Sequence, residues 1–255
     1  MLVRLPTRPS AVGQIEKEHF WLPKLAPHVT TRSIAIPSPL TRGEADVSFP
    51  WPWGIYAWIE GESAATARIA NMHQMAKDIA RFVVTMRNAP HDGSPIASDN
   101  MMRGEPLVHR DVGTRESILA LSDELNAAVA LNAWECALAA PPWLDSPRWV
   151  HGDLLPGNLL VRNGRLCAII DFGAARVGDP AVDAMPAWTN FMRETRTTFR
   201  REIDVDDATW NRARGWALSW AVIALAYYRR SNSPLSDIAR HAIREVLEEH
   251  GAQST

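Results

Sequence analysis

The sequence predicts an α+β protein with two unequal lobes, a small N-terminal lobe that contains a sheet and a large C-terminal lobe that is mostly helical. Residues 1–60 hold short, Pro-rich, strand-like segments. From Ser63 onward, apolar residues recur at the three- and four-residue spacing of helices. A β-hairpin pattern then interrupts the helical part at 159–170. These observations place one lobe at 1–60 and the other at 62–255, with a hinge near 57–61.

Four segments define the small lobe. Residues 1–5 alternate weakly and predict a strand, and Pro9-Ser10 can open a helix that continues to Leu25. Residues 34–40 are extended and contain two prolines, which suits an edge strand. A further strand is expected over Ile55–Ile59, and Glu60-Gly61-Glu62 ends it.

The large lobe is expected to contain five helical segments. The first begins near Ser63, and one apolar face follows from the spacing of Ile69, Met72, Ile79, Val83 and Met86. A long loop over 88–113 leads to a second helix that begins at Thr114 and ends before Pro141-Pro142. Three more helical segments are predicted at 184–200, 206–230 and 234–250.

The most informative stretch lies between these helices. Leu159 to Arg162 and Arg165 to Ile170 form the strands of a hairpin, and Asn163-Gly164 is a two-residue turn of type I′. The hairpin folds Asp171 back beside Asn158, so a carboxylate and an amide oxygen can share a magnesium ion. Asp153 lies five residues before Asn158 and can accept a proton from a hydroxyl group.

This arrangement resembles a known family. His151-Gly152-Asp153, Asn158, Asp171-Phe172-Gly173 and the later Gly178-Asp179-Pro180-Ala181-Val182-Asp183 together resemble the aminoglycoside phosphotransferases, small-molecule kinases with a protein-kinase-like fold. The resemblance implies transfer of the γ-phosphate of ATP or GTP, with Mg²⁺, to a hydroxyl of a small molecule, an aminoglycoside-like antibiotic first of all. It covers nearly the whole chain and is specific over 149–183.

The resemblance also implies roles for the residues of the motif. Asp153 would be the catalytic base, and Asn158 and Asp171 would bind Mg²⁺. His151 and Gly152 would support the catalytic loop, with His151 as a second base the alternative. Asp179 and Asp183 would brace the loop that carries the metal.

The nucleotide site is expected to use both lobes. Arg4 stands where the family usually has a Lys, and it would pair the phosphates and a helix Glu, either Glu18, which we favour, or Glu16. An exposed Arg on an edge strand is the alternative. Backbone groups of Ala57, Trp58 and Ile59 would face the adenine of the nucleotide. Leu160 and Ile170 would form the apolar floor of that site, a role compatible with ordinary strand packing.

One feature departs from the family pattern. The fold normally begins with two strands and a glycine-containing phosphate loop, whereas this sequence starts at the third strand. We expect either that Met1 is an internal methionine of a longer reading frame or that the lobe is reduced, with an open sheet edge beside Leu2, Val3 and Leu5.

Composition excludes several classes of protein. The net charge is −2, which argues against a nucleic-acid partner bound to a basic face. The two cysteines lie in apolar runs without metal-type spacing, so we expect buried thiols and no zinc. The eleven Trp residues are dispersed and predict core packing. No signal peptide or membrane span is expected, and a cytoplasmic monomer or homodimer is the default.

The acceptor is less well defined than the reaction. Family members hold polycationic sugars with acidic residues of the C-terminal helices, and this chain offers a set that could equally be solvated helix ends: Glu194, Glu202, Asp204, Asp206 and Asp207. A metabolic kinase of the choline or fructosamine type is the alternative enzyme. A degenerate kinase that binds nucleotide without catalysis is the alternative from another class.

Overall fold

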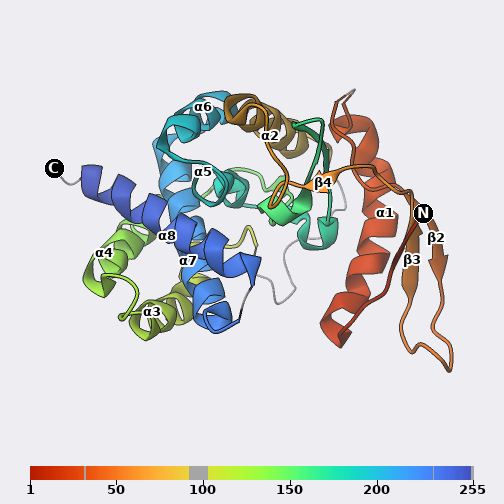
Figure 1. The fold of residues 1–255 in the computed structure, drawn as a ribbon, viewed down its shortest axis with the longest axis horizontal. Helices are drawn as coiled ribbons and strands as arrows, with labels where there is room; N and C mark the ends of the chain where they lie inside the picture. Colours follow the sequence, from red (N-terminus) through yellow and green to blue (C-terminus); the bar gives the residue numbers. More distant parts are fainter. Residues whose placement is uncertain (32, 92–102, 232, 254–255) are drawn as a thin grey trace.

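The elements separate into an N-terminal and a C-terminal group. The computed structural model describes residues 1–31, 33–91, 103–231 and 233–253. In Figure 1 the N-terminal strands and α1 occupy one end of the molecule, and α8 extends toward the opposite end. This architecture of small antiparallel sheets and a large helical part confirms the predicted fold class.

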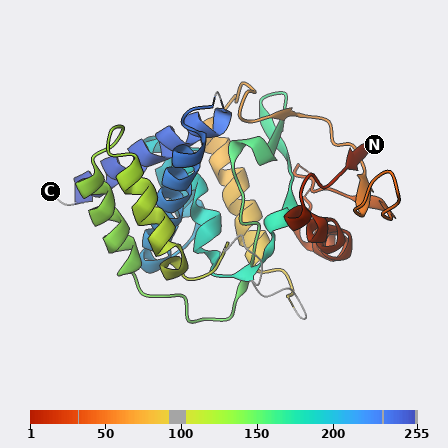
Figure 2. The same cartoon turned by 90° about the horizontal axis from the view of Figure 1, so that it is seen from below.

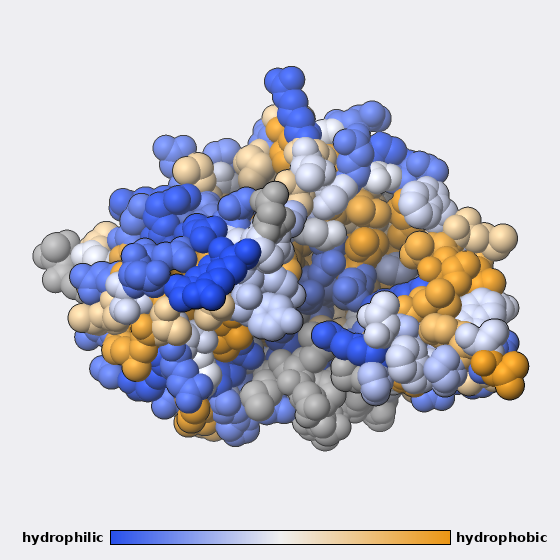
Figure 3. Space-filling model, turned by 60° about the horizontal axis from the view of Figure 1, so that its bottom comes forward, coloured by the Kyte–Doolittle hydropathy of each residue, from blue (hydrophilic) through white to orange (hydrophobic). Residues whose placement is uncertain are grey.

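The N-terminal group is a three-stranded antiparallel sheet with a helix beside it. The sheet order is β1-β3-β2, and the strand bounds are Leu2–Arg4 for β1, Pro39–Gly43 for β2 and Trp53–Tyr56 for β3. Helix α1 runs from Val12 to Val29, after a 3₁₀ turn at Pro9–Ala11. Leu2, Val3 and Leu5 are exposed, and hydrophobic residues gather over this end of the molecule in Figure 3.

Two further small sheets frame the motif. One has the order β4-β6-β7, with bounds Glu62–Ser63, Leu159–Arg162 and Arg165–Ile169. The other pairs β5, Arg148–Val150, with β8, Arg176–Gly178. The turn between β6 and β7 has positive φ at Asn163 (54°) and Gly164 (73°), as a type I′ turn requires, which confirms the predicted hairpin. Residues 57–61 connect the first sheet to the second.

Helices make up most of the C-terminal group, and α7 runs through its middle (Figures 1 and 2). Packing against both α3 and α8 explains why so much of α7 is buried. The bounds are Met72–Arg87 (α2), Asp111–Ala120 (α3), Ala127–Leu138 (α4), Pro186–Thr189 (α5), Arg193–Ile203 (α6), Asp207–Tyr228 (α7) and Pro234–Gln253 (α8). A 3₁₀ turn at Leu107–Arg110 precedes α3.

Several predicted boundaries were wrong. Helix α2 begins at Met72 and not near Ser63, because Asn71 caps it by accepting a hydrogen bond from the Gln74 N–H at 2.9 Å. The helix predicted from Thr114 begins at Asp111 and is two helices, since Asn126 caps α4. Strand β3 ends at Tyr56 instead of Ile59. Residues 92–102 of the predicted loop at 88–113 lie outside the described residues, and the end of that range forms the 3₁₀ turn at Leu107–Arg110 and the start of α3.

The core matches the expectation for tryptophan but not for cysteine. Five Trp side chains are fully buried: Trp134, Trp149, Trp188, Trp210 and Trp216. Cys136 is exposed and Cys167 is half-buried, so the apolar runs around them did not bury their thiols. Within the described ranges, each helix lacks either the length or the apolar content needed to cross a bilayer.

Candidate active site

The loop after β5 and the end of the hairpin bring Asp153, Asn158 and Asp171 together. Asn158 ends a 3₁₀ turn that leads directly into β6. Asp171 follows β7 and adopts a left-handed conformation, φ 63°. The Ile170 N–H donates to the Asn158 carbonyl at 2.9 Å, which ties the two ends of the hairpin. The expected proximity of Asn158 and Asp171 therefore follows from backbone pairing.

Asn158 is oriented by Asp153. Its side-chain Nδ2 donates to the Asp153 carbonyl at 2.8 Å and to the Asp153 Oδ2 at 2.9 Å. Because the amino half of the amide is bound to Asp153, the amide oxygen is left for another partner. Asn158 also lines the cavity described below, as does Asp171. One amide oxygen and one carboxylate on the same wall are hard oxygen donors, and they fit the two protein ligands that a Mg²⁺ ion commonly uses.

His151 is fully engaged in holding the loop. Its Nδ1 accepts from the Asp153 N–H at 3.2 Å, and its Nε2 lies 3.1 Å from the Ile170 carbonyl. These partners require a lone pair on Nδ1 and a proton on Nε2, the neutral tautomer. The ring is buried and packs edge-on against Phe172. This arrangement suits a supporting role and leaves no nitrogen for a substrate.

The Asp183 side chain anchors the backbone of the same loop. Its carboxylate oxygens accept from the His151 N–H and the Gly152 N–H, each at 2.7 Å. Asp183 is 1 % exposed, and this burial raises the pKa of its carboxyl, while the two backbone N–H donors act in the opposite direction. Gly152 has φ 78°, a conformation that favours glycine.

Asp179 makes different contacts. Its carboxylate forms a two-pronged ion pair with Arg212 of α7, at 2.7 and 3.2 Å, and accepts from the Ala181 N–H at 2.9 Å. These partners lie in the 3₁₀ turn at Pro180–Ala184 and in α7. Asp179 fixes that turn, which carries Asp183, against the helical core.

A cavity of about 390 Å³ lies between the N-terminal sheet and the hairpin. A hollow between the two groups of elements is visible in Figure 3. The predicted nucleotide and metal residues on its wall are Arg4, Ala57, Trp58, Ile59, Asn158, Leu160, Ile170 and Asp171. Leu2, Pro37, Tyr56 and Gly61, which were not predicted, complete the wall.

The segment 57–59 offers only part of its backbone to a ligand. The Ala57 N–H donates to the Ser38 carbonyl at 2.9 Å, because residue 57 continues the pairing of β3 with β2. Among the described residues, no backbone hydrogen bond from Trp58 or Ile59 is formed. The Ala57 carbonyl and the backbone of Trp58 and Ile59 are therefore the groups that can face a bound base.

Arg4 joins the two sides of the cavity. It forms an ion pair with Glu18 of α1, and its Nη2 lies 2.8 Å from Asp171 Oδ1. The Tyr56 hydroxyl donates to the second oxygen of Glu18 at 2.7 Å. Burial raises the pKa of Glu18, and Arg4 and Tyr56 oppose that effect. Glu16, the alternative partner, instead pairs with Arg42 at 2.9 Å.

The acidic residues considered for the acceptor have local partners. Asp206 caps α7 by accepting from the Thr209 N–H, Asp207 pairs with Arg200, and Glu202 lies 3.3 Å from Arg201. Such contacts are typical of helix ends, which was the alternative to a role of these acidic residues in acceptor binding. Glu194 is exposed in the first turn of α6.

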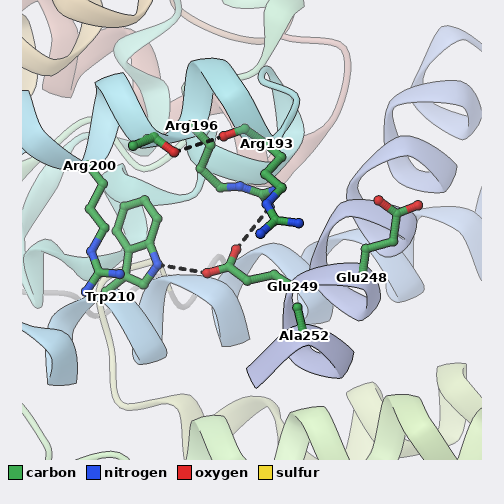
Figure 4. Close-up of a pocket in the computed structure, with 8 residues that line it drawn as sticks. Arg193, Arg196, Arg200, Trp210, Glu248, Glu249 and Ala252 are labelled. Carbon is green, nitrogen blue, oxygen red and sulfur yellow. Dashed lines mark hydrogen bonds and ion pairs between the residues drawn. The ribbon is translucent and has the colours of Figure 1, made fainter. Parts of the chain in front are cut away.

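A second cavity, of about 320 Å³, lies among α6, α7 and α8 (Figure 4). Arg196 and Glu249 on its wall form an ion pair at 3.1 Å, and Arg196 also pairs with Glu245 at 2.7 Å. Glu249 accepts from the indole N–H groups of Trp188 and Trp210. These mutual contacts satisfy the buried charges and hold the helices together, and no residue of the Asp153 loop lines this cavity.

Sequence reasoning missed two residues at the site. Tyr56 holds Glu18, and Arg103 contacts Asp153 Oδ1 through Nη2 at 3.3 Å. Strand alternation at β3, which buries Gly54 and Tyr56, could have indicated that Tyr56 points inward. No local pattern marks Arg103, because it lies 50 positions before its partner.

Comparisons with known proteins agree with this geometry. The model of the phosphotransferase enzyme family matches residues 1–216. The GDP and kanamycin complex of APH(2″)-IIIa superposes with a TM-score of 0.68 at 20% identity, over 99% of this chain and 87% of that one. The macrolide 2′-phosphotransferase MphH of Brachybacterium faecium gives 0.60 at 21% identity, over 94% and 83%. These likenesses establish the fold. No curated protein sequence matches the chain.

Proposed function

The chain belongs to the phosphotransferase enzyme family, and we propose that it transfers the γ-phosphate of ATP or GTP to a hydroxyl group of a small molecule. One observation carries the proposal. Asp153, Asn158 and Asp171 converge beside a cavity that Arg4 and the segment 57–59 also line. A protein that only bound nucleotide would not need Asp153, a carboxylate that contacts Asn158 but does not line the cavity.

In this proposal Asp153 acts on the acceptor. Its carboxylate is 21 % exposed and is held by Asn158, so it can accept the hydroxyl proton while the oxygen attacks phosphorus. The bond between phosphorus and the β–γ bridging oxygen breaks, and the nucleoside diphosphate leaves. Phosphoryl transfer depends mainly on alignment and charge stabilisation, so a base of ordinary strength is sufficient.

The nucleotide would occupy the larger cavity. The side chains of Leu160 and Ile170 give the base an apolar floor, and the Ala57 carbonyl and the Ile59 backbone can bind its edge. Arg4 would bind the phosphates. Asn158 and Asp171 would hold Mg²⁺, which when bound offsets the negative charge of the phosphates.

The comparisons support a proposal for the class of acceptor. Aminoglycoside and macrolide phosphotransferases are both among the similar structures, so antibiotics with free hydroxyls, aminoglycosides first, are the proposed acceptors. A metabolic alcohol, of the kind that choline or fructosamine kinases use, is the alternative.

The test is phosphate transfer by the purified protein. ATP and GTP, each with Mg²⁺, are offered with aminoglycosides, macrolides, choline and a fructosamine, and phosphorylated product is measured by mass spectrometry. We expect product with at least one acceptor and a loss of roughly 10²- to 10⁴-fold in kcat in Asp153→Asn, with nucleotide affinity retained.

Asp123→Asn is the matched control, because Asp123 is an exposed carboxylate that pairs with Arg229 on the surface. It should leave transfer unchanged. Nucleotide binding without product for any acceptor would instead favour the non-catalytic alternative, and wild-type kcat in Asp153→Asn would remove Asp153 as the base.

A further inference from the structure

Arg103 is a buried cation next to the proposed base. Only 7 % of the residue is exposed, and it lies four positions before the 3₁₀ turn at Leu107–Arg110 that precedes α3. Its Nη2 lies 3.3 Å from Asp153 Oδ1. Its Nη1 is buried and has no hydrogen-bond partner among the residues that the structure describes.

The backbone around Arg103 is fixed against the motif. The carbonyl of Gly104 accepts from the Asp179 N–H at 2.7 Å, next to β8. Gly178 allows this approach, since a Cβ there would lie 2.4 Å from the Gly104 oxygen. The position of Arg103 is therefore set by the same β8 segment that precedes Asp179.

The aliphatic part of Arg103 covers the loop at Gly152. A Cβ on Gly152 would lie 3.1 Å from the Arg103 Cβ and 3.4 Å from its Cγ. Arg103 thus fills the space that a side chain at position 152 would take. The guanidinium then reaches the carboxylate of the next residue, Asp153.

The contact is unlike the other buried ion pair nearby. Arg212 binds both oxygens of Asp179, at 2.7 and 3.2 Å, which is the strong two-pronged geometry. Arg103 makes one longer contact, and its burial lowers its pKa, which is raised in turn by Asp153. Burying a guanidinium is costly, and a single contact at 3.3 Å offsets this cost poorly. Stability alone does not account for the placement.

We propose that Arg103 is a positioning residue that fixes the direction of the Asp153 carboxylate. Arg103 contacts Oδ1 and Asn158 donates to Oδ2, so each carboxylate oxygen has its own partner and the orientation of the group is fixed. Arg103 neither gives nor takes a proton in the reaction. This inference rests on the proposed function, because the carboxylate direction matters for catalysis only if Asp153 accepts the hydroxyl proton.

The kinetic test separates positioning from general stability. In Arg103→Met the stem is kept and the charge is lost, and we expect kcat to fall roughly 10- to 100-fold while the KM for nucleotide is unchanged, because Arg103 does not line the nucleotide cavity. Arg103→Lys should recover part of kcat, since it restores a cation. The control Arg110→Met removes a half-buried guanidinium that binds Ser219 instead; it should lower stability without lowering kcat.

A second arm does not depend on activity. Thermal midpoints of Arg103→Met, Asp153→Asn and the double variant form a cycle. Two residues in contact should be non-additive, so the double variant should lose less than the sum of the single losses, by roughly 2 to 10 °C.

The outcomes distinguish the two proposals. The positioning role is overturned if the wild type is active and Arg103→Met has the same kcat. It is also overturned if Arg103→Met loses no more kcat than Arg110→Met. Additive midpoints overturn the contact itself. A wild type that transfers no phosphate contradicts the proposed function, and coupled midpoints in that case would still establish that Arg103 holds Asp153.

Discussion

The sharpest structural prediction concerns Asp183→Asn. The Asp183 carboxylate accepts two backbone N–H groups, from His151 and Gly152, each at 2.7 Å, and the side chain is 1 % exposed. An asparagine of the same shape keeps one acceptor oxygen and turns an amino group toward the other N–H. One buried donor is then left without a partner, which costs about 1–3 kcal/mol.

Two effects decide the size of the loss. Burial already raises the pKa of Asp183, so removing its charge recovers part of the desolvation cost and favours the lower half of that range. In a chain of this length each kcal/mol shifts the midpoint by roughly 2–4 °C, so a loss of about 1–2 kcal/mol should lower the thermal midpoint by roughly 2–8 °C. The loosened loop should also displace Asp153 and lower kcat by roughly 10-fold.

Thermal and urea unfolding at pH 7.5, followed by circular dichroism, measure the change in stability. Transfer kinetics measure the expected fall in kcat. Asp123→Asn is again the control, because its exposed pair with Arg229 should contribute at most about 1 kcal/mol. Unfolding of Asp183→Asn at the wild-type midpoint would show that this carboxylate does not support the loop.

Three further predictions follow from individual contacts. Tyr56→Phe removes the donor to buried Glu18 and should cost about 1–3 kcal/mol in urea unfolding; an unchanged midpoint would contradict this. Asp171→Asn should weaken nucleotide binding with Mg²⁺ but not without it, as calorimetry can measure; equal losses in both conditions would rule out the metal role. Burial lowers the pKa of His241, so its contribution to stability should be complete above about pH 6.5 and fall as the pH drops below that value. Midpoints at pH 7.5 and 5.5 should differ less in His241→Gln, and an equal difference in both proteins would refute the assignment.

Local sequence was sufficient for much of the site. The hairpin follows from Asn163-Gly164 and its flanking apolar strands, and it alone determines that Asn158 and Asp171 approach each other. Two residues of the cavity wall, Leu160 and Ile170, could be predicted because they lie within two positions of Asn158 and Asp171 in the chain. Regular strand pairing converts such sequence offsets directly into distances.

Residues placed by tertiary packing could not be predicted in the same way. Arg103 reaches Asp153 only because Gly104 packs on Gly178 and Asp179, a contact between distant segments. The break between α3 and α4 has a similar origin. Leu121 is fully buried where the helix ends, and Asn126 restarts the next helix as its cap. The helical spacing of apolar residues continues through this break, so the periodicity did not predict where α3 ends.

The contact between Arg4 and Asp171 predicts how nucleotide and Mg²⁺ should bind. Arg4 Nη2 lies 2.8 Å from Asp171 Oδ1, so a cation already occupies one oxygen of the proposed metal ligand. Nucleotide phosphates would attract Arg4 and free that oxygen, so each ligand should strengthen the other. Calorimetry should therefore find weak Mg²⁺ binding to the free protein and stronger binding with ATP or GTP analogues, beyond the affinity of the nucleotide itself for Mg²⁺. In Arg4→Gln the free protein should bind Mg²⁺ more tightly, because the competing guanidinium is gone. If Arg4→Gln and wild type bind Mg²⁺ equally in the absence of nucleotide, Arg4 does not compete for Asp171, and the expected coupling has no structural basis.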